Sequence, residues 1–160
     1  MNSRIARSSG QLHTLGYEKR SLEEFLALLR QAGIDVVVDV RDTPWSHKPG
    51  FSRQPLSVAL ADAGIEYVHA RFAGNPKALR SIASDNAEAI RLYADHLRQR
   101  PEILDQLDTL LEPLLANDQR VCLICFERDP RHCHRGVLSA SWTARHGAAV
   151  LHLGNDAPGA

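Results

Sequence analysis

The sequence predicts the α/β fold class: a single three-layer domain with a mainly parallel sheet of about five strands and helices on both faces. Short apolar segments alternate along the chain with segments whose apolar residues recur every three or four positions, the spacing of a helix face. One apolar segment contains three consecutive valines, Val36 to Val38, as expected when both faces of a parallel sheet are covered. With 160 residues, 44% of them hydrophobic, the chain can fill the core of one domain.

Each element in the first half of the chain has a local signal. Gly16 ends the first apolar segment, and Ser21 with Glu24 forms a capping box at the start of a helix that Gly33 ends. Gly64 closes the second helix in the same way. In order, the expected elements are a strand over 12–15, a helix over 22–33, a strand over 35–40, a polar loop over 41–53, a helix over 56–63 and a strand over 65–69.

The second half continues the alternation. Pro101 is expected to open a helix, and Pro113 should kink or shorten its last turn. Asp129 has the position of an N-cap, and Pro130 that of a first helical residue. The expected elements are helices over 87–97 and 101–114, a strand over 121–126, a helix from about Pro130 to His146 and a strand over 149–153.

Composition limits the classes of function. Nineteen basic and nineteen acidic residues give a formal net charge of zero, which argues against broad binding to nucleic acid or to an acidic membrane. The apolar runs are shorter than the roughly 20 residues that span a bilayer, and three cysteines are unlike a secreted disulfide framework. We therefore expect a cytoplasmic protein with no membrane partner. We expect a disordered segment over 1–11, the domain over 12–153 and a flexible tail over 154–160.

The segment from Cys125 to Arg135 carries the strongest functional signal. It follows an apolar strand, and it brings thiol, carboxylate, imidazole and guanidinium groups into eleven consecutive residues. A strand-to-helix junction directs backbone N–H groups and the positive end of a helix dipole to one place. The segment therefore predicts a functional site, although it does not identify the reaction.

Polar and basic residues accumulate where the predicted strands end, although the whole chain is neutral. Parallel sheets bind their ligands at this edge, so the pattern predicts a small anionic ligand. The candidate catalytic residues are Asp39, Glu127, Cys133 and His134, and the candidate substrate-binding residues are Tyr17, Arg41, Ser46, Arg71, Asn75, Lys77, Cys125 and Arg135.

Several motifs carry a family resemblance. They are Thr14-Leu15-Gly16-Tyr17, Asp39-Val40-Arg41, Gly74-Asn75-Pro76-Lys77, Cys125-Phe126-Glu127 and Cys133-His134-Arg135. Through them the chain resembles the bacterial and archaeal family known as domain of unknown function 488, over nearly its whole length. The resemblance implies a compact α/β domain and no established activity. One departure is Ala73, because such proteins tend to have a Leu-Gly pair where this chain has Ala73-Gly74.

Some of these residues also have a structural interpretation. Asp39 and Arg41 share a strand face, and they form either a functional pair or a structural ion pair that holds the loop. Glu127 is a general acid or base, or it pairs with Arg135 or Arg41. His134 contacts an anion or supplies a proton, or it caps a carbonyl while Arg135 braces the loop.

The three cysteines differ in their expected roles. Cys122 and Cys125 are separated by three positions of a strand, so they point to opposite faces and Cys122 belongs to the core. Cys133, at a helix start near Arg and His residues, is expected to have a lowered pKa. The spacing of Cys125, Cys133 and a histidine matches no zinc motif, so no metal ligand is assigned and the cofactor is left unknown.

Two classes of function remain. We expect an enzyme, of hydrolase or transferase type, that acts on a small anionic substrate containing a phosphate or nucleotide group at the carboxyl edge of the sheet. The alternative is a non-catalytic accessory module that binds a nucleotide, another anion or nucleic acid, or a metal or redox site at the Cys-His-Arg turn. Nucleic acid is not favoured as a partner, and the sequence does not indicate the oligomeric state.

Overall fold

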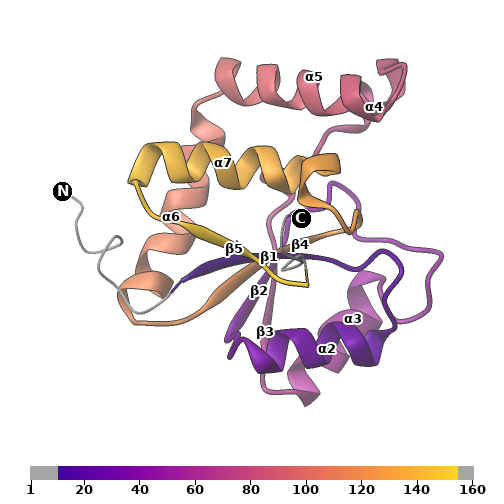
Figure 1. Cartoon of the computed structure of the whole chain (residues 1–160), viewed down its shortest axis with the longest axis vertical. Coiled ribbons are helices and arrows are strands. Elements are labelled where there is room, and N and C mark those ends of the chain that lie inside the picture. Colours follow the sequence, from indigo (N-terminus) through magenta and orange to yellow (C-terminus); the bar gives the residue numbers. More distant parts are fainter. Residues whose placement is uncertain (1–10, 155–160) are drawn as a thin grey trace.

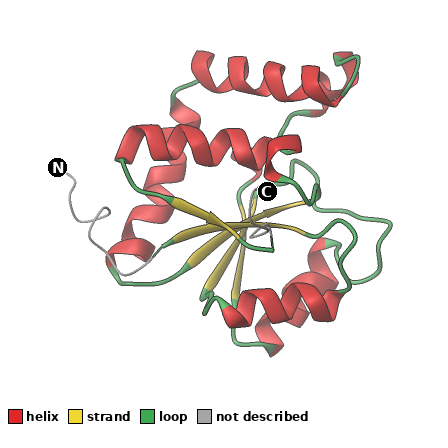
Figure 2. Ribbon diagram, viewed as in Figure 1, coloured by secondary structure: helices red, strands yellow, loops and turns green. Residues whose placement is uncertain are grey.

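Five parallel strands form one sheet in the order β3-β2-β4-β1-β5 (Figure 2). The structure is a computed structural model and describes residues 11–154. Because every pairing is parallel, the carboxyl ends of the strands meet at one edge. The predicted parallel sheet is confirmed. The strands are β1 (Leu12–Gly16), β2 (Val36–Asp39), β3 (Glu66–His69), β4 (Val121–Cys125) and β5 (Val150–His152).

Helices cover both faces of the sheet and complete the predicted three-layer α/β domain (Figure 1). On one face lie α2 (Leu22–Gln31) and α3 (Arg53–Asp62). On the other lie α6 (Glu102–Ala116) and α7 (His134–His146), and α5 (Asn86–Gln99) packs on the outer side of α7. Three short elements complete the described chain: η1 (Arg71–Ala73), α4 (Lys77–Ile82) and η2 (Pro130–His132).

The central strands divide their side chains between two cores. Val36 and Val38 pack with the residues of α6 and α7, whereas Val37 packs with those of α2 and α3. Cys122 lies in the second core and Cys125 in the first, so the prediction that they point to opposite faces is confirmed. Full burial on both sides explains why β2 consists of branched apolar residues up to Asp39.

The start of α7 differs from the prediction. Asp129 caps the short turn η2, where its side chain accepts a hydrogen bond from the backbone N–H of Arg131. Cys133 then has extended backbone angles, φ −135° and ψ 144°, so the helix begins at His134 and not at Pro130. Gly136 permits this change of direction, because a Cβ there would lie 2.0 Å from the carbonyl oxygen of Pro130.

Other predictions about the helices have mixed outcomes. The capping box of Ser21 and Glu24 is present, with both hydrogen bonds formed. Pro113 does not shorten α6, which continues to Ala116 because Leu115 is buried in the core. The helix α4 was not predicted.

The predicted terminal segments lie almost wholly outside the described residues. Their described ends are Gln11 and Gly154, and the carbonyl oxygen of Gly154 accepts a hydrogen bond from Arg20 at 3.3 Å. No helix in the described part of the chain is long and apolar enough to cross a membrane.

Candidate functional site

The sheet reverses its direction of winding around β4. From β1 and β2 the chain passes to α2 and α3 on one face, whereas from β4, which lies between those strands, it passes to α7 on the other face. Neighbouring strands that send the chain to opposite faces leave a crevice at their carboxyl ends, and this is where open α/β sheets bind ligands.

A cavity of about 640 Å³ occupies this position and is called the edge cavity below. Residues from the ends of β1, β2 and β4 line it, together with residues of η2, α4 and α5. It brings together many of the residues that the sequence predicts for a site. Those that line it are Tyr17, Arg41, Ser46, Asn75, Cys125, Glu127 and His134.

Asp39 and Arg41 form a buried ion pair beside this cavity. Arg41 donates from Nε to one carboxylate oxygen of Asp39 at 2.9 Å and from Nη2 to the other at 2.7 Å. Tyr67 donates to the same carboxylate at 2.5 Å. Arg41 also donates to the backbone carbonyl of Phe51 at 2.7 Å and to the hydroxyl of Tyr17 at 3.2 Å. The pair thus anchors the loop that follows β2. Arg41 lines the cavity, whereas Asp39 does not.

Cys125, Cys133 and His134 form a buried cluster on the floor of the edge cavity. The Sγ of Cys125 lies 3.6 Å from Nδ1 of His134, and one ligand atom from each of the three residues lies within 4.8 Å of the others. The Nε2–H of His134 donates to the carbonyl oxygen of Val40 at 2.7 Å. Cys125 and His134 line the cavity, whereas Cys133 lies behind them with 1% of its surface exposed.

The pKa values of the two thiols in this cluster are shifted in opposite directions. Burial alone would raise the pKa of Cys133, but its hydrogen bonds with Cys125 and His134 and the charge of Arg135 lower that pKa well below the usual thiol value. The pKa of Cys125 is instead raised, by its hydrogen bond with Cys133 and by burial. The more acidic thiol is therefore the one that does not face the cavity.

Glu127 lines the cavity from the loop after β4. Burial, with a contribution from the neighbouring Cys133, raises the pKa of its carboxyl group to about 7. Arg135 is fully buried and holds this loop from behind, because it donates to the carbonyl oxygens of Glu127 at 2.6 Å and of Arg128 at 3.3 Å. The loop also approaches Gly16 so closely that a Cβ there would lie 1.8 Å from the carbonyl oxygen of Glu127.

Asn75 is a buried polar residue in the cavity wall with an unsatisfied side-chain oxygen. It is 8% exposed and lines the edge cavity, and within residues 11–154 its Oδ1 has no hydrogen-bond partner. The turn that holds it is tightly packed, because a Cβ on Gly74 would lie 2.5 Å from the Cα of Asp42. A buried amide oxygen without a partner loses the hydrogen bond that water would have given it, so a bound ligand that donates to it stabilises the site.

Other predicted residues lie outside the cavity. The side chain of Arg71 is 75% exposed and lies near Asp42 at 3.8 Å, and Lys77 is exposed at the start of α4. Asp39, Cys133 and Arg135 lie in the layer beneath the cavity wall.

The structure also adds residues that were not proposed as site residues. Arg80, Asn86 and His132 line the cavity because α4, the start of α5 and η2 lie over the carboxyl edge. No sequence motif indicates the position of Arg80 or Asn86, whereas His132 lies within the segment from Cys125 to Arg135 that predicts a site. Lys48 and Trp45 line the cavity too. Their position in the polar loop that follows β2 is the sequence feature that could have identified them as site residues.

A family model described as Domain of unknown function DUF488 matches residues 21–141, which include the ends of β2 and β4 and the whole Cys-His-Arg turn. The chain belongs to this family, as its motifs predict. Neither a curated protein nor a solved structure matches it.

Proposed function

We propose that this DUF488 protein is an enzyme, a hydrolase or a transferase, that acts on a small anionic substrate of phosphate or nucleotide type in the edge cavity. A volume of about 640 Å³ suits a nucleotide-sized ligand, since small-molecule sites measure roughly 300–1,000 Å³. The position at the reversal of winding supports the same conclusion.

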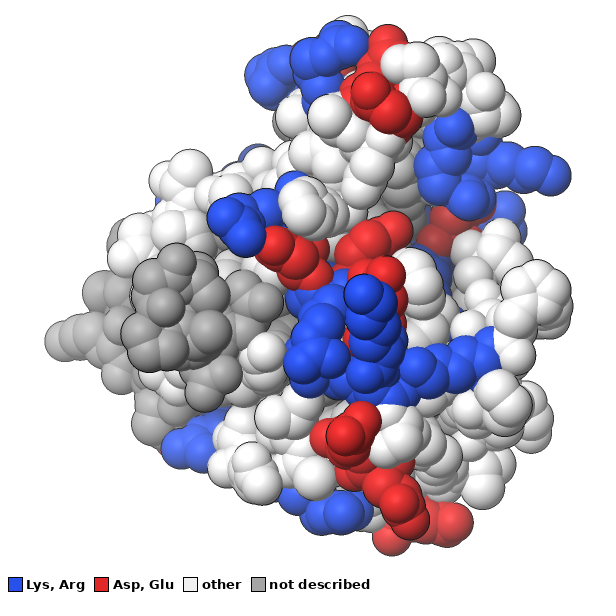
Figure 3. Space-filling view, turned by 45° about the vertical axis from the view of Figure 1, so that its right-hand side comes forward, with Lys and Arg blue, Asp and Glu red and all other residues white. Residues whose placement is uncertain are grey.

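The anionic character of the substrate rests on Lys48. Within residues 11–154 no carboxylate lies within ion-pair distance of its ammonium group, which contacts the carbonyl oxygen of Tyr17 at 3.4 Å and lies over the ring of Phe51, 5.7 Å from its centroid. Arg80 lines the same cavity with half of its side chain exposed and has a distant partner, Asp42 at 3.7 Å. Figure 3 shows this side of the molecule, where basic side chains gather near the centre with acidic ones around them. An anion bound here pairs with Lys48 and Arg80.

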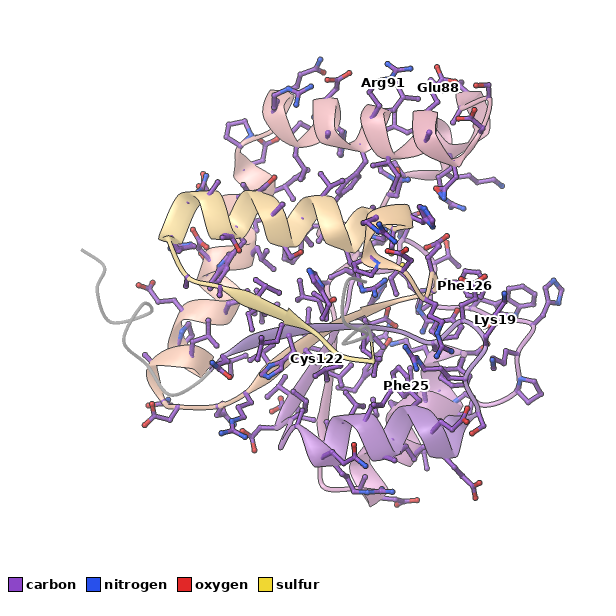
Figure 4. The ribbon with its side chains drawn as sticks, viewed as in Figure 1. Lys19, Phe25, Glu88, Arg91, Cys122 and Phe126 are labelled. Carbon is purple, nitrogen blue, oxygen red and sulfur yellow. The ribbon has the colours of Figure 1, made fainter. Side chains whose placement is uncertain are left out.

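Aromatic side chains at the rim support a substrate with a planar group. Trp45 is 57% exposed and Phe126 is 42% exposed, and both line the cavity. Figure 4 places Phe126 at the end of the sheet, beside the loop that carries Lys19. Exposed aromatic side chains in a cavity that also contains Lys48 suit a nucleobase, and the unsatisfied oxygen of Asn75 suits the N–H donors of such a base.

The chemistry is assigned to Glu127. This carboxyl group faces the same cavity as Lys48, and in the described chain it forms no ion pair, so it is available to accept or donate a proton. The convergence of an unpaired cation and an unpaired carboxyl group in one cavity is the observation that carries the proposal.

A thermal-shift screen tests the binding half of this proposal. Phosphate, sulfate, nucleotides and small carboxylates are added to the reduced protein and to two pairs of matched variants. Lys48→Ala is compared with Lys77→Ala, and Arg80→Ala with Arg71→Ala, because Lys77 and Arg71 lie outside the cavity. A ligand at about a hundredfold its Kd adds about 2.7 kcal/mol, which raises Tm by about 5–10 °C.

The expected result is a shift with one class of anion that Lys48→Ala and Arg80→Ala reduce and the two control variants retain. A shift that all four variants retain places the anion elsewhere and contradicts the proposal. The absence of a shift with every anion contradicts it as well.

A further inference from the structure

We infer that Cys125, Cys133 and His134 bind a zinc ion on the floor of the edge cavity, with one coordination position open to the cavity. Cys125 and Cys133 supply Sγ, and His134 supplies Nδ1. These atoms lie within 4.8 Å of one another, and all three residues are buried.

The distance between Cys125 and His134 suits a tetrahedral ion, and the other two ligand-to-ligand distances are at most 4.8 Å. With Zn–S near 2.3 Å and Zn–N near 2.0 Å, a tetrahedral site places sulfur and nitrogen about 3.5 Å apart and two sulfurs about 3.8 Å apart. The Sγ of Cys125 and Nδ1 of His134 lie 3.6 Å apart. Two thiolates and an imidazole are donors that zinc prefers.

The orientation of His134 is an independent observation. Its Nε2–H donates to the carbonyl oxygen of Val40 at 2.7 Å, so Nδ1 can carry the lone pair that faces the two sulfurs. A metal-binding histidine typically has its other ring nitrogen held by a backbone carbonyl or a carboxylate. The ring of Tyr93 packs edge-on against the imidazole, with centroids 4.9 Å apart, and helps to fix this orientation.

The surroundings favour thiolates at this position. Arg135 is fully buried next to the cluster, and within the described residues it has no carboxylate within ion-pair distance. Cys133 is the N-cap residue of α7, but its side chain makes no capping hydrogen bond, and its Sγ interacts instead with Cys125 and His134, the other two proposed ligands.

The three residues leave a fourth position free. Glu127 does not belong to the group of ligand atoms, and Cys125 and His134 face the edge cavity. Three protein ligands with an open position distinguish a catalytic zinc site from a closed structural one. The role of the ion in turnover rests on the proposed function; its binding does not.

Metal binding to the folded, reduced protein tests this inference. The protein is freed of metal with a chelator and titrated with Zn²⁺, and bound zinc is measured by elemental analysis. A parallel titration with Co²⁺ reports thiolate-to-cobalt absorption, which identifies sulfur ligands. Cys125→Ser and Cys133→Ser are compared with Cys122→Ala, because Cys122 is buried in the opposite core, mid-sheet in Figure 4. Circular dichroism checks that each variant is folded.

About one zinc ion per chain is expected, with thiolate-to-cobalt absorption. Cys125→Ser and Cys133→Ser should each lower the zinc affinity at least tenfold, and Cys122→Ala should leave it unchanged. A folded, reduced wild-type protein that takes up neither ion overturns the inference, and this outcome does not depend on any variant. Cobalt bound without thiolate absorption overturns it too.

The two proposals fail separately. If zinc binds but no anion gives a Lys48-dependent thermal shift, the metal site stands and the proposed function falls. If an anion gives that shift and no zinc binds, the metal site falls and the anion site stands.

Discussion

His134 donates the hydrogen of Nε2 to the carbonyl oxygen of Val40 at 2.7 Å, across a sequence separation of 94 residues. This bond ties the first turn of α7 to the end of β2, and it turns Nδ1 towards the Sγ of Cys125. The arrangement of the cluster on the cavity floor therefore depends on how the carboxyl ends of two neighbouring strands meet.

Asp39→Asn tests the role of the buried ion pair. The substitution removes the charge partner of Arg41, which is 5% exposed, so we expect a loss of about 3–5 kcal/mol in the free energy of unfolding. Urea denaturation measures this loss. The matched control is Asp129→Asn, because its partner Arg131 is exposed and that change should have little effect. Equal effects of the two substitutions would rule out a structural role for the Asp39–Arg41 pair.

Asn75→Ala separates ligand binding from stability. The buried Oδ1 has no hydrogen-bond partner among the residues that the structure describes, so its removal should change the free energy of unfolding by less than about 1 kcal/mol. The affinity for the anion found in the thermal-shift screen should fall about tenfold, because one hydrogen bond to the ligand is lost. Asn117→Ala, at the exposed end of α6, serves as the control. Unchanged affinity in Asn75→Ala would remove this residue from the site.

Gly16→Ala tests the contact between β1 and the loop after β4. A Cβ at this position would lie 1.8 Å from the carbonyl oxygen of Glu127, so the loop must move. We expect a loss of roughly 1–3 kcal/mol in stability, as for other overpacked positions, and weaker ligand binding because Glu127 is displaced. Urea denaturation and the thermal-shift screen measure the two effects. A variant with unchanged stability and normal binding would show that neither property depends on the close contact between Gly16 and the loop after β4.

The pH dependence of stability tests the burial of His13. Its ring is 3% exposed, and desolvation lowers its pKa in the folded state below the ordinary value of about 6.5. Between the two pKa values the unfolded chain binds more protons than the folded one, so stability falls as the pH drops below about 6.5. The slope contributed by one proton is at most about 1.4 kcal/mol per pH unit. In His13→Gln this slope should be smaller, as measured by urea denaturation from pH 7 to pH 5, and an identical slope would contradict the prediction.

The fold followed from the sequence where local signals and burial agree. The capping box at Ser21 and the valines of β2 each determine one element without reference to the rest of the chain. The start of α7 did not follow, because the extended backbone of Cys133 depends on packing between Gly136 and the carbonyl of Pro130.

The sequence predicted at which edge of the sheet the candidate site lies, but not how its residues are arranged there. Rules for parallel sheets place Tyr17, Cys125 and Glu127 together, and the structure brings them to one cavity. These rules do not show which polar residues at that edge already form hydrogen bonds within the protein. Asp39 bonds to Arg41, and Arg135 bonds to the backbone of Glu127. The contribution of Arg80 depends on the position of α4 over the edge, which is a tertiary contact.

The central claim is that the edge cavity performs chemistry on the anion that it binds. The most direct measurement is the rate of turnover of the anion class found in the screen, with Glu127→Gln compared with Glu66→Gln, whose carboxylate is exposed on the edge strand β3. We expect turnover by the wild type and by Glu66→Gln, and a loss of about 10²-fold or more in Glu127→Gln with the thermal shift retained. Binding without turnover in the wild type, or equal rates in the two variants, would contradict the claim and indicate a non-catalytic binding module.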